Sequence, residues 1–220
     1  MKKLIFVLAI TFLIASCKES AKTSDSKTIL KTTKKGKSNY KDLYVNITFS
    51  DGPLKGTHKF VKEKGKIANI GINYFKTSKN PNQVNSTSLS TNALISEDGK
   101  LKLMFLSKSF KGKIEKGNHD VIYFTDSSKD KYCTQFMILN NGHSFDFSRM
   151  KSKNITCNST EITGFSDWKE GTVMNRRTVS GNFIDTFELN FKNKDGKSVQ
   201  EVTAEVKVSF NSRQQEMKSE

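Results

Sequence analysis

Apolar and polar residues alternate with a period of two along most of the chain from residue 42 onward. Val45, Ile47 and Phe49 alternate with more polar neighbours, and the pattern returns in 201–210, apolar on one face and charged on the other. Such alternation is typical of half-buried strands, because successive side chains of a strand point to opposite faces. A sustained stripe of period 3.6, which would predict a helix, is not found in this part of the sequence.

Turn signals separate these runs. They include Asp51-Gly52-Pro53, Asp98-Gly99, Asn141-Gly142 and Asp195-Gly196. The Asn-Gly pair is the strongest, because it supplies the positive φ angles that a type I′ hairpin turn requires. The pattern predicts hairpins over 93–107, 132–147 and 183–210, and a strand over 120–125. It also predicts a long polar loop over 76–92, with a brief edge strand inside it as the alternative. About ten to twelve strands with frequent turns predict an all-β fold, an antiparallel β-sandwich with a barrel-like closure as the alternative.

The N-terminus has a different pattern. Lys2 and Lys3 precede a short apolar run over 4–15. This run is shorter than the roughly 20 residues that span a bilayer, and it has the design of a secretory signal peptide. It ends in Ile14-Ala15-Ser16-Cys17, which resembles the lipobox of bacterial lipoproteins: an aliphatic residue, two small residues and a cysteine.

The resemblance implies that the Cys17 thiol is diacylated, that the chain is cut before Cys17, and that the new amine is acylated, with palmitate as an expected acyl chain. Two or more acyl chains give stable membrane anchoring, whereas one gives weak and reversible binding. The alternative is an ordinary secreted protein with an incidental cysteine at its cleavage site. Lys18 follows Cys17 where an aspartate would favour retention in the inner membrane of enteric bacteria. We therefore expect a lipid-anchored protein of the cell envelope, on the periplasmic face of the outer membrane or at the cell surface.

The segment after Cys17 is polar and basic, with eight lysines and two acidic residues between Lys18 and Lys41. Such a composition predicts a disordered tether, whose lysines could also contact anionic lipid headgroups. The formal net charge of the chain is +15. About half of this excess lies in the signal and the tether, which weakens the interpretation of the charge as a nucleic-acid site. We expect no specific nucleic-acid partner.

These patterns divide the chain into four segments. About 200 residues follow the signal peptide, which is enough for one sizeable β domain or two small ones. The alternative that the two halves of the chain form independent domains therefore stays open. The predicted segments are a signal peptide (1–16), the lipidated cysteine with its tether (17–41), a β-sandwich domain (42–212) and a disordered C-terminal tail (213–220).

Two cysteines remain after Cys17. Cys133 and Cys157 form an even pair in an oxidising compartment, which predicts a disulfide. Two free thiols or a metal pair are the alternatives. There is no CxxC spacing, and His143 alone between the cysteines makes a poor zinc site.

A set of short motifs begins near residue 100. They are "LKLMFLS", "GKIEKGNHDVIYF", "YCTQFMI", "NITCNSTEITGF", "TVSGNFIDTFEL" and "DGKSVQEVTAEVKVSF". Their layout is similar to that of small Bacteroidota lipoproteins with no assigned activity, over about half of the chain. The resemblance implies a β-sandwich and a lipid anchor. Because the family's activity is unassigned, it transfers no functional residue.

Catalytic motifs are missing from the sequence: there is no HExxH, GxSxG or Walker-type loop, and the three histidines are far apart. We therefore predict no catalytic, cofactor-binding or metal-binding residues. Asp120, Asp126, Asp146 and Asp185 lie on or near predicted strands. A pair of them could meet as acid and base, although solvation at the surface is favoured.

Trp168 is the main candidate for ligand contact, and Tyr123 and Tyr132 are the other two candidates. It lies in the polar, turn-rich stretch "GFSDWKEG". An exposed tryptophan there could stack on a sugar ring or anchor a partner; alternatively it caps one end of the sandwich. The sequence favours a non-catalytic binding or structural role with an envelope protein, a glycan or a toxin as partner. The alternatives are a carboxylate-dependent hydrolase of envelope polymers and a binder of polyanions such as lipopolysaccharide.

Overall fold

The structure of the protein is a computed structural model that describes residues 43–76, 85–125, 131–141 and 149–217. The chain divides into two units, 1–37 and 38–220, and all described residues belong to the second. The predicted signal peptide, Cys17 and the tether lie outside the described residues. No helix in the described part is long and apolar enough to cross a membrane.

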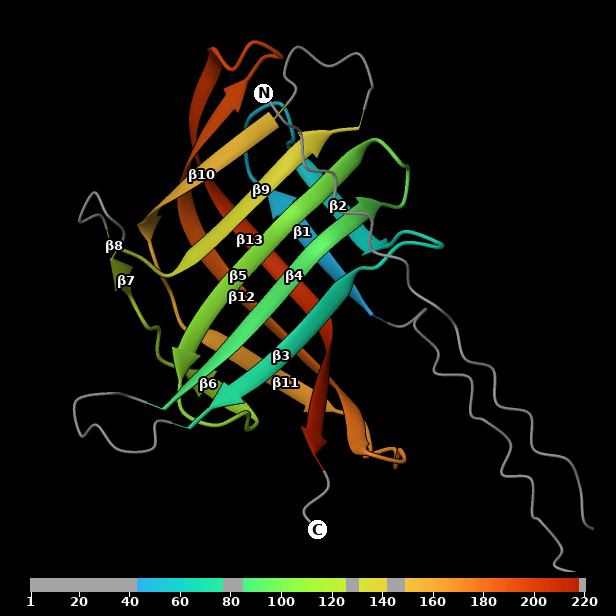
Figure 1. The fold of residues 1–220 in the computed structure, drawn as a ribbon. Coiled ribbons are helices and arrows are strands. Elements are labelled where there is room, and N and C mark those ends of the chain that lie inside the picture. Colours follow the sequence, from blue (N-terminus) through green and yellow to red (C-terminus); the bar gives the residue numbers. More distant parts are fainter. Residues whose placement is uncertain (1–42, 77–84, 126–130, 142–148, 218–220) are drawn as a thin grey trace, which may run out of the picture. The chain divides into compact units, whose positions relative to one another are not determined.

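Thirteen strands make up the described part of the second unit (Figure 1). Their bounds are β1 Tyr44–Phe49, β2 Gly56–Lys62, β3 Asn69–Phe75, β4 Ser86–Ser96, β5 Leu101–Lys111, β6 Gly117–His119, β7 Phe124–Thr125, β8 Lys131–Tyr132, β9 Thr134–Asn140, β10 Arg149–Thr156, β11 Thr160–Phe165, β12 Met174–Lys192 and β13 Ser198–Met217. Eleven strands form one sheet, in the order β2-β1-β13-β3-β4-β5-β9-β10-β12-β11-β6, and β7 and β8 form a small separate sheet.

The large sheet closes on itself. β12 pairs with β13 as well as with β10 and β11, and β2 pairs with β4 as well as with β1. In Figure 1, β4, β5 and β9 form the near layer and β1, β12 and β13 the far layer. Neighbouring strands run antiparallel except for β13 and β3, which meet in parallel at one residue pair. The predicted all-β class, sandwich-like or barrel-like, is confirmed.

The apolar residues of the alternating pattern point to the inside of this sheet, and the polar residues point to the outside. Every second residue of β1 is buried, and so is every second residue of the central part of β12. The buried side chains are mostly phenylalanine, leucine, isoleucine and valine from both layers. Phe136 of β9 meets Phe187 of β12 edge-on, with ring centroids 4.9 Å apart. Burial of this apolar surface is the main force that holds the layers together.

Strands from both halves of the sequence share the sheet. Tyr44–Phe49 of β1 pair with 206–211 of β13, and β5 pairs with β9. The two halves therefore do not form separate sheets in the described part of the chain.

Three predictions about strand bounds need correction. The segment 76–92, predicted as a loop with a brief edge strand as the alternative, contains the first part of the central strand β4, where Thr87, Leu89 and Thr91 are buried. A serine- and threonine-rich segment forms a strand here because β3 and β5 pair with it on both sides. The predicted strand over 120–125 is not continuous, because only Phe124–Thr125 of it belongs to a named strand, β7.

The third correction concerns the C-terminus. The domain was predicted to end at residue 212, with a disordered tail over 213–220, but β13 continues to Met217. Residues 213–217 pair with Met174–Thr178 at the start of β12, which satisfies their backbone hydrogen-bonding groups. The predicted Asn141-Gly142 turn, with His143, lies outside the described residues from Gly142 onward.

Candidate functional site

Trp168 lies in the loop that joins β11 to β12. The loop is tied to the start of β12 by backbone hydrogen bonds: Ser166 N–H donates to the Thr178 carbonyl (3.1 Å), and Lys169 and Arg176 exchange bonds of 2.7 and 3.0 Å. Figure 1 shows this loop at the lower right, near the end of β13. The bonds fix the path of the chain on both sides of Trp168.

The Trp168 ring belongs to a stack with Arg177 and Phe165. The Arg177 guanidinium carbon lies 4.0 Å from the centroid of Phe165 and 4.6 Å from that of Trp168. Trp168 and Phe165 keep 37% and 36% of their surface exposed. A guanidinium that stacks on aromatic rings gains cation–π attraction and is held in one plane. We call these three residues the Trp168 surface.

The register of the strands explains why these residues meet. Phe165 pairs with Val179, and Arg177 pairs with Gln214, so their side chains share the face of the sheet that carries buried Val179. Phe165 and Arg177 therefore lie on the same face of the sheet as the buried residue Val179. They lie nearer the end of the strands, where this face is only partly covered. Trp168 is partly buried, and more than a third of its surface stays open to solvent.

Arg177 is further held by a hydrogen bond. Its Nε donates to Oε1 of Gln214 at 2.7 Å, and Gln214 Nε2 donates to Glu216 at 3.3 Å. Partial burial lowers the pKa of Arg177, and the Glu216 carboxylate works in the opposite direction. A guanidinium remains charged under these conditions. The stack thus presents a fixed positive charge that lies against two aromatic rings.

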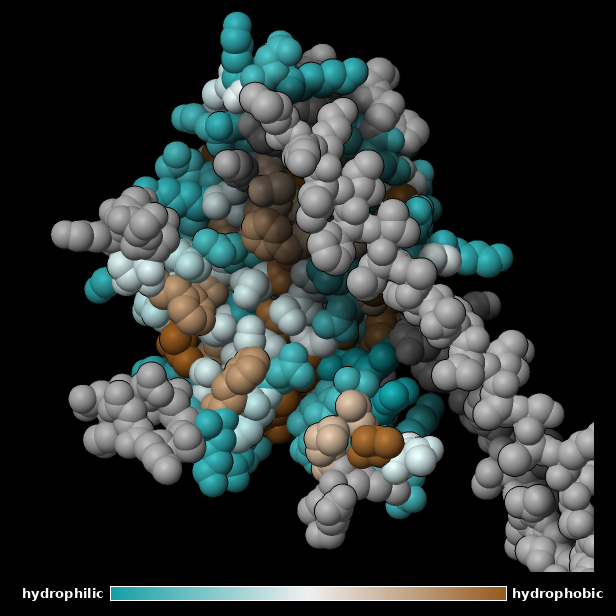
Figure 2. Space-filling view, viewed as in Figure 1, coloured by the Kyte–Doolittle hydropathy of each residue, from teal (hydrophilic) through white to brown (hydrophobic). Residues whose placement is uncertain are grey.

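Tyr123 and Tyr132 lie elsewhere in the unit. Tyr123 is exposed, and Tyr132 of β8 contacts Phe124 of β7 with ring centroids 5.8 Å apart. Figure 1 shows β7 and β8 on a different side from the β11–β12 loop, so the three candidates do not form one site. Figure 2 shows apolar side chains at the surface as small patches among polar ones, one of them at the lower end near the end of β13.

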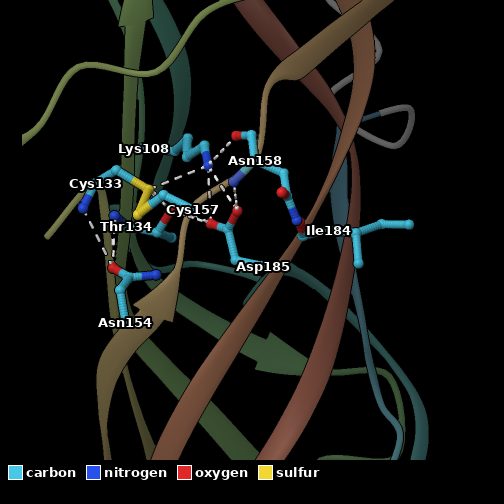
Figure 3. The surroundings of a disulfide bond; sticks show 8 residues. All are labelled: Lys108, Cys133, Thr134, Asn154, Cys157, Asn158, Ile184 and Asp185. Carbon is cyan, nitrogen blue, oxygen red and sulfur yellow. Dashed lines mark hydrogen bonds and ion pairs between the residues drawn. A yellow bond between two sulfur atoms is a disulfide. The ribbon is translucent and has the colours of Figure 1, made fainter.

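A second cluster is buried around the disulfide (Figure 3). Lys108 of β5 and Asp185 of β12 are both 0% exposed, and Lys108 Nζ lies 2.9 and 2.8 Å from the two carboxylate oxygens. Nζ also donates to the Asn158 carbonyl at 3.0 Å. Burial lowers the pKa of Lys108, and the neighbouring Asp185 carboxylate opposes this shift.

Both oxygens of Asp185 have further donors. Thr134 Oγ1 donates to Oδ2 at 2.5 Å, and the Asn158 backbone N–H donates to Oδ1 at 2.8 Å. Buried charges are tolerated when they are paired and their remaining hydrogen-bonding groups are satisfied. The cluster links β5, β9 and β12 through charge within the apolar core.

The predicted disulfide between Cys133 and Cys157 is confirmed, with the two Cα atoms 6.1 Å apart. It lies against the ion pair, since Lys108 Nζ is 3.4 Å from Cys133 Sγ. Asn158, next to Cys157, supplies two of the contacts described above. The disulfide therefore fixes the short connection between β10 and β11 over the buried charges.

The acid–base hypothesis finds no shared site in the described residues. Asp185 is fully buried in its ion pair, whereas the side chain of Asp120 is 81% exposed beside Lys111. Asp126 and Asp146 lie outside the described residues. Where side chains are described, no group of three or more histidine, cysteine or acidic residues is placed to hold a metal ion.

Sequence reasoning missed Lys108, Phe165 and Arg177. For Arg177 a signal was present: the chain uses arginine only four times among its 37 basic residues, and Arg176 and Arg177 are adjacent. Arginine is favoured over lysine where a planar group must stack or bind two acceptors at once. Lys108 gave no signal, because a lysine on a strand is usually exposed.

Comparison of the chain with protein-family models, with curated protein sequences and with solved structures gives no match.

Proposed function

We propose that this protein is a lipid-anchored, non-catalytic binding module of the cell envelope and that the Trp168 surface contacts its ligand. One observation carries the proposal: an arginine stacks on two partly exposed aromatic rings at the end of the sheet where β12 begins. Exposed tryptophan and arginine are the residues most often responsible for binding energy at contact surfaces.

The location rests on the sequence. Ile14-Ala15-Ser16-Cys17 after a short apolar run resembles a lipobox, and the motifs from residue 100 resemble those of Bacteroidota lipoproteins. Both support an outer-membrane protein anchored through Cys17, on the periplasmic face or at the cell surface.

A binding role fits the Trp168 surface better than catalysis. Its residues offer rings and a permanently charged guanidinium, and none of these groups exchanges a proton near neutral pH. The ionisable pair with an unusual environment, Lys108 and Asp185, is fully buried and out of reach of a substrate.

The experiment compares Trp168→Ala with Phe75→Ala, which removes another exposed ring, from the C-terminal end of β3. The full-length proteins are immobilised and tested for capture of solubilised cell-envelope material. Removal of an anchoring tryptophan should reduce capture by about tenfold or more, whereas Phe75→Ala should leave it unchanged.

Melting temperatures of both variants provide the control for folding. Trp168 is partly exposed, so its variant should melt within a few degrees of the wild type. Equal capture by the wild type and Trp168→Ala would refute the proposed contact surface.

A further inference from the structure

We propose that the ligand of the Trp168 surface is an acidic glycan of the uronic-acid type, whose carboxylate binds Arg177 and whose sugar ring lies against Trp168. This inference rests on the proposed function and names the class of ligand for the same site.

The first argument is the free hydrogen-bonding capacity of Arg177. A guanidinium carries five N–H donors, and Nε uses one of them for Gln214. Within the described residues, no other hydrogen bond or ion pair of Arg177 is formed. The terminal nitrogens therefore have no hydrogen-bond acceptor among the described residues, although the Glu216 carboxylate is close enough to act on the charge of Arg177. They can still donate to an acceptor of a ligand.

The second argument is preorganisation. Phe165 and Trp168 lie 4.0 and 4.6 Å from the guanidinium carbon, and the bond to Gln214 fixes its remaining rotation. The terminal nitrogens of a guanidinium match the two oxygens of a carboxylate in a planar, bidentate pair. Because the side chain is already held, little rotamer entropy is lost on binding.

The third argument is the character of the surroundings. The residues next to Trp168 in its loop are exposed and polar: Ser166, Asp167, Lys169 and Glu170. A stable protein partner would cover about 800 Å² with an apolar centre. Two rings that are each only about a third exposed, with hydrogen-bonding groups beside them, instead match a single sugar ring. Such a ring offers a C–H face to the indole and hydroxyl groups to its neighbours.

Charge at long range points the same way. Outside the signal and the tether, residues 42–220 carry 27 basic and 20 acidic residues. A net positive protein raises the local concentration of a polyanion and speeds its association. This attraction acts on any polyanion. The specificity for a sugar that carries a carboxylate must therefore come from the stack of Phe165, Arg177 and Trp168.

The test measures binding of full-length protein to three soluble polymers: polygalacturonate, dextran sulfate and neutral dextran. We expect polygalacturonate to bind best in 0.15 M salt. Arg177→Lys keeps the charge but loses the planar fork, and should weaken this binding about tenfold. Trp168→Ala should weaken it to a similar extent.

Arg176→Gln is the matched control, because Arg176 is the preceding residue of the same strand and is exposed on the opposite face. It removes one charge and should change the affinity by less than about twofold. If Arg176→Gln weakens binding as much as Arg177→Lys, the attraction is non-specific and the inference is wrong. Equal or better binding of dextran sulfate or neutral dextran would also overturn the carboxylate assignment.

The outcomes separate this inference from the proposed function. Trp168-dependent capture of envelope material without binding of polygalacturonate would overturn the glycan assignment and leave the contact surface standing. Loss of Trp168 dependence in both assays would overturn both.

Discussion

At the scale of single residues, Gly181 shows how closely the strands approach. It lies in β12 between Phe210 of β13 and Glu161 of β11. A Cβ atom at this position would lie 2.5 Å from the Phe210 ring and 2.5 Å from the Glu161 carbonyl oxygen. The carbonyl belongs to the backbone of a paired strand and cannot move aside cheaply, so the sheet requires glycine here for space.

We predict that Gly181→Ala lowers the free energy of unfolding by about 1–3 kcal/mol, as overpacking of a core does. Gly164→Ala is the control, because the added methyl group would meet nothing within 4 Å; it should change stability by less than about 0.5 kcal/mol. Urea unfolding of both variants measures the difference. Equal stability of the two variants would contradict the close approach.

At Gly181 the absence of a side chain matters, whereas at Lys108 and Asp185 the charge of the side chain matters. The two form a fully buried ion pair. Lys108→Met leaves the Asp185 carboxylate buried without its partner, and we predict a loss of about 3–5 kcal/mol. The double variant Lys108→Met/Asp185→Leu removes both charges and should recover a large part of this loss. Denaturant unfolding in the absence of reductant is the measurement. A double variant less stable than the single variant would show that the charges are not the reason.

At the scale of elements, the disulfide joins Cys133, the residue just before β9, to Cys157, the residue just after β10. The two cysteines are separated by 24 positions in the sequence, and closure of such a loop stabilises a fold by roughly 3 kcal/mol. Replacement of both, Cys133→Ala with Cys157→Ser, should lower the free energy of unfolding by that amount. Reductant should destabilise the wild type and leave the double variant unchanged. A response of the double variant to reductant would point to another cause.

The turn between β4 and β5 contains an acid-sensitive contact. Asp98 Oδ1 accepts from Ser96 Oγ at 2.6 Å and from the Lys100 N–H at 3.1 Å. The Ser96 hydrogen bond in particular lowers the pKa of Asp98 below 3.8. A lowered carboxyl pKa stabilises the fold above the unfolded value and loses this contribution as pH falls through the folded value.

Asp98→Asn should therefore be slightly less stable than the wild type at pH 7, and the difference should vanish below the folded pKa of Asp98. Because the side chain is half exposed, the effect is small. Unfolding midpoints between pH 2 and 7 test this prediction. A constant difference over the whole range would exclude the carboxylate as its source.

The elements also show how far sequence reasoning reaches. Strict alternation identified β1 and the β12–β13 hairpin, because half-buried strands must alternate. The first half of β4 was missed, since its serines and threonines form a strand only through pairing with β3 and β5. The polar surroundings of Trp168 in the sequence made it a candidate for ligand contact. Its contact with Arg177 depends on the register of β11, β12 and β13, which local pattern does not encode.

At the scale of the whole molecule, the proposed anchor and the proposed binding surface lie in different segments of the chain. Cys17 precedes the basic stretch 18–41, and the Trp168 surface belongs to the second unit. The two functions should therefore separate by mutation. A variant without the anchor should keep the ligand affinity of the Trp168 surface, and Trp168→Ala should keep its place in the membrane.

We predict that the mature chain begins at lipidated Cys17 and that Cys17→Ser moves the protein out of the membrane fraction. The thiol is the only group of the Ile14-Ala15-Ser16-Cys17 motif that can form a thioether, so serine cannot take its place. Intact mass of membrane-purified protein and fractionation of both forms test this. A mature mass without lipid, or a Cys17→Ser chain that stays in the membrane, would refute it. If the anchor serves only for location, the released variant should still bind polygalacturonate as the wild type does.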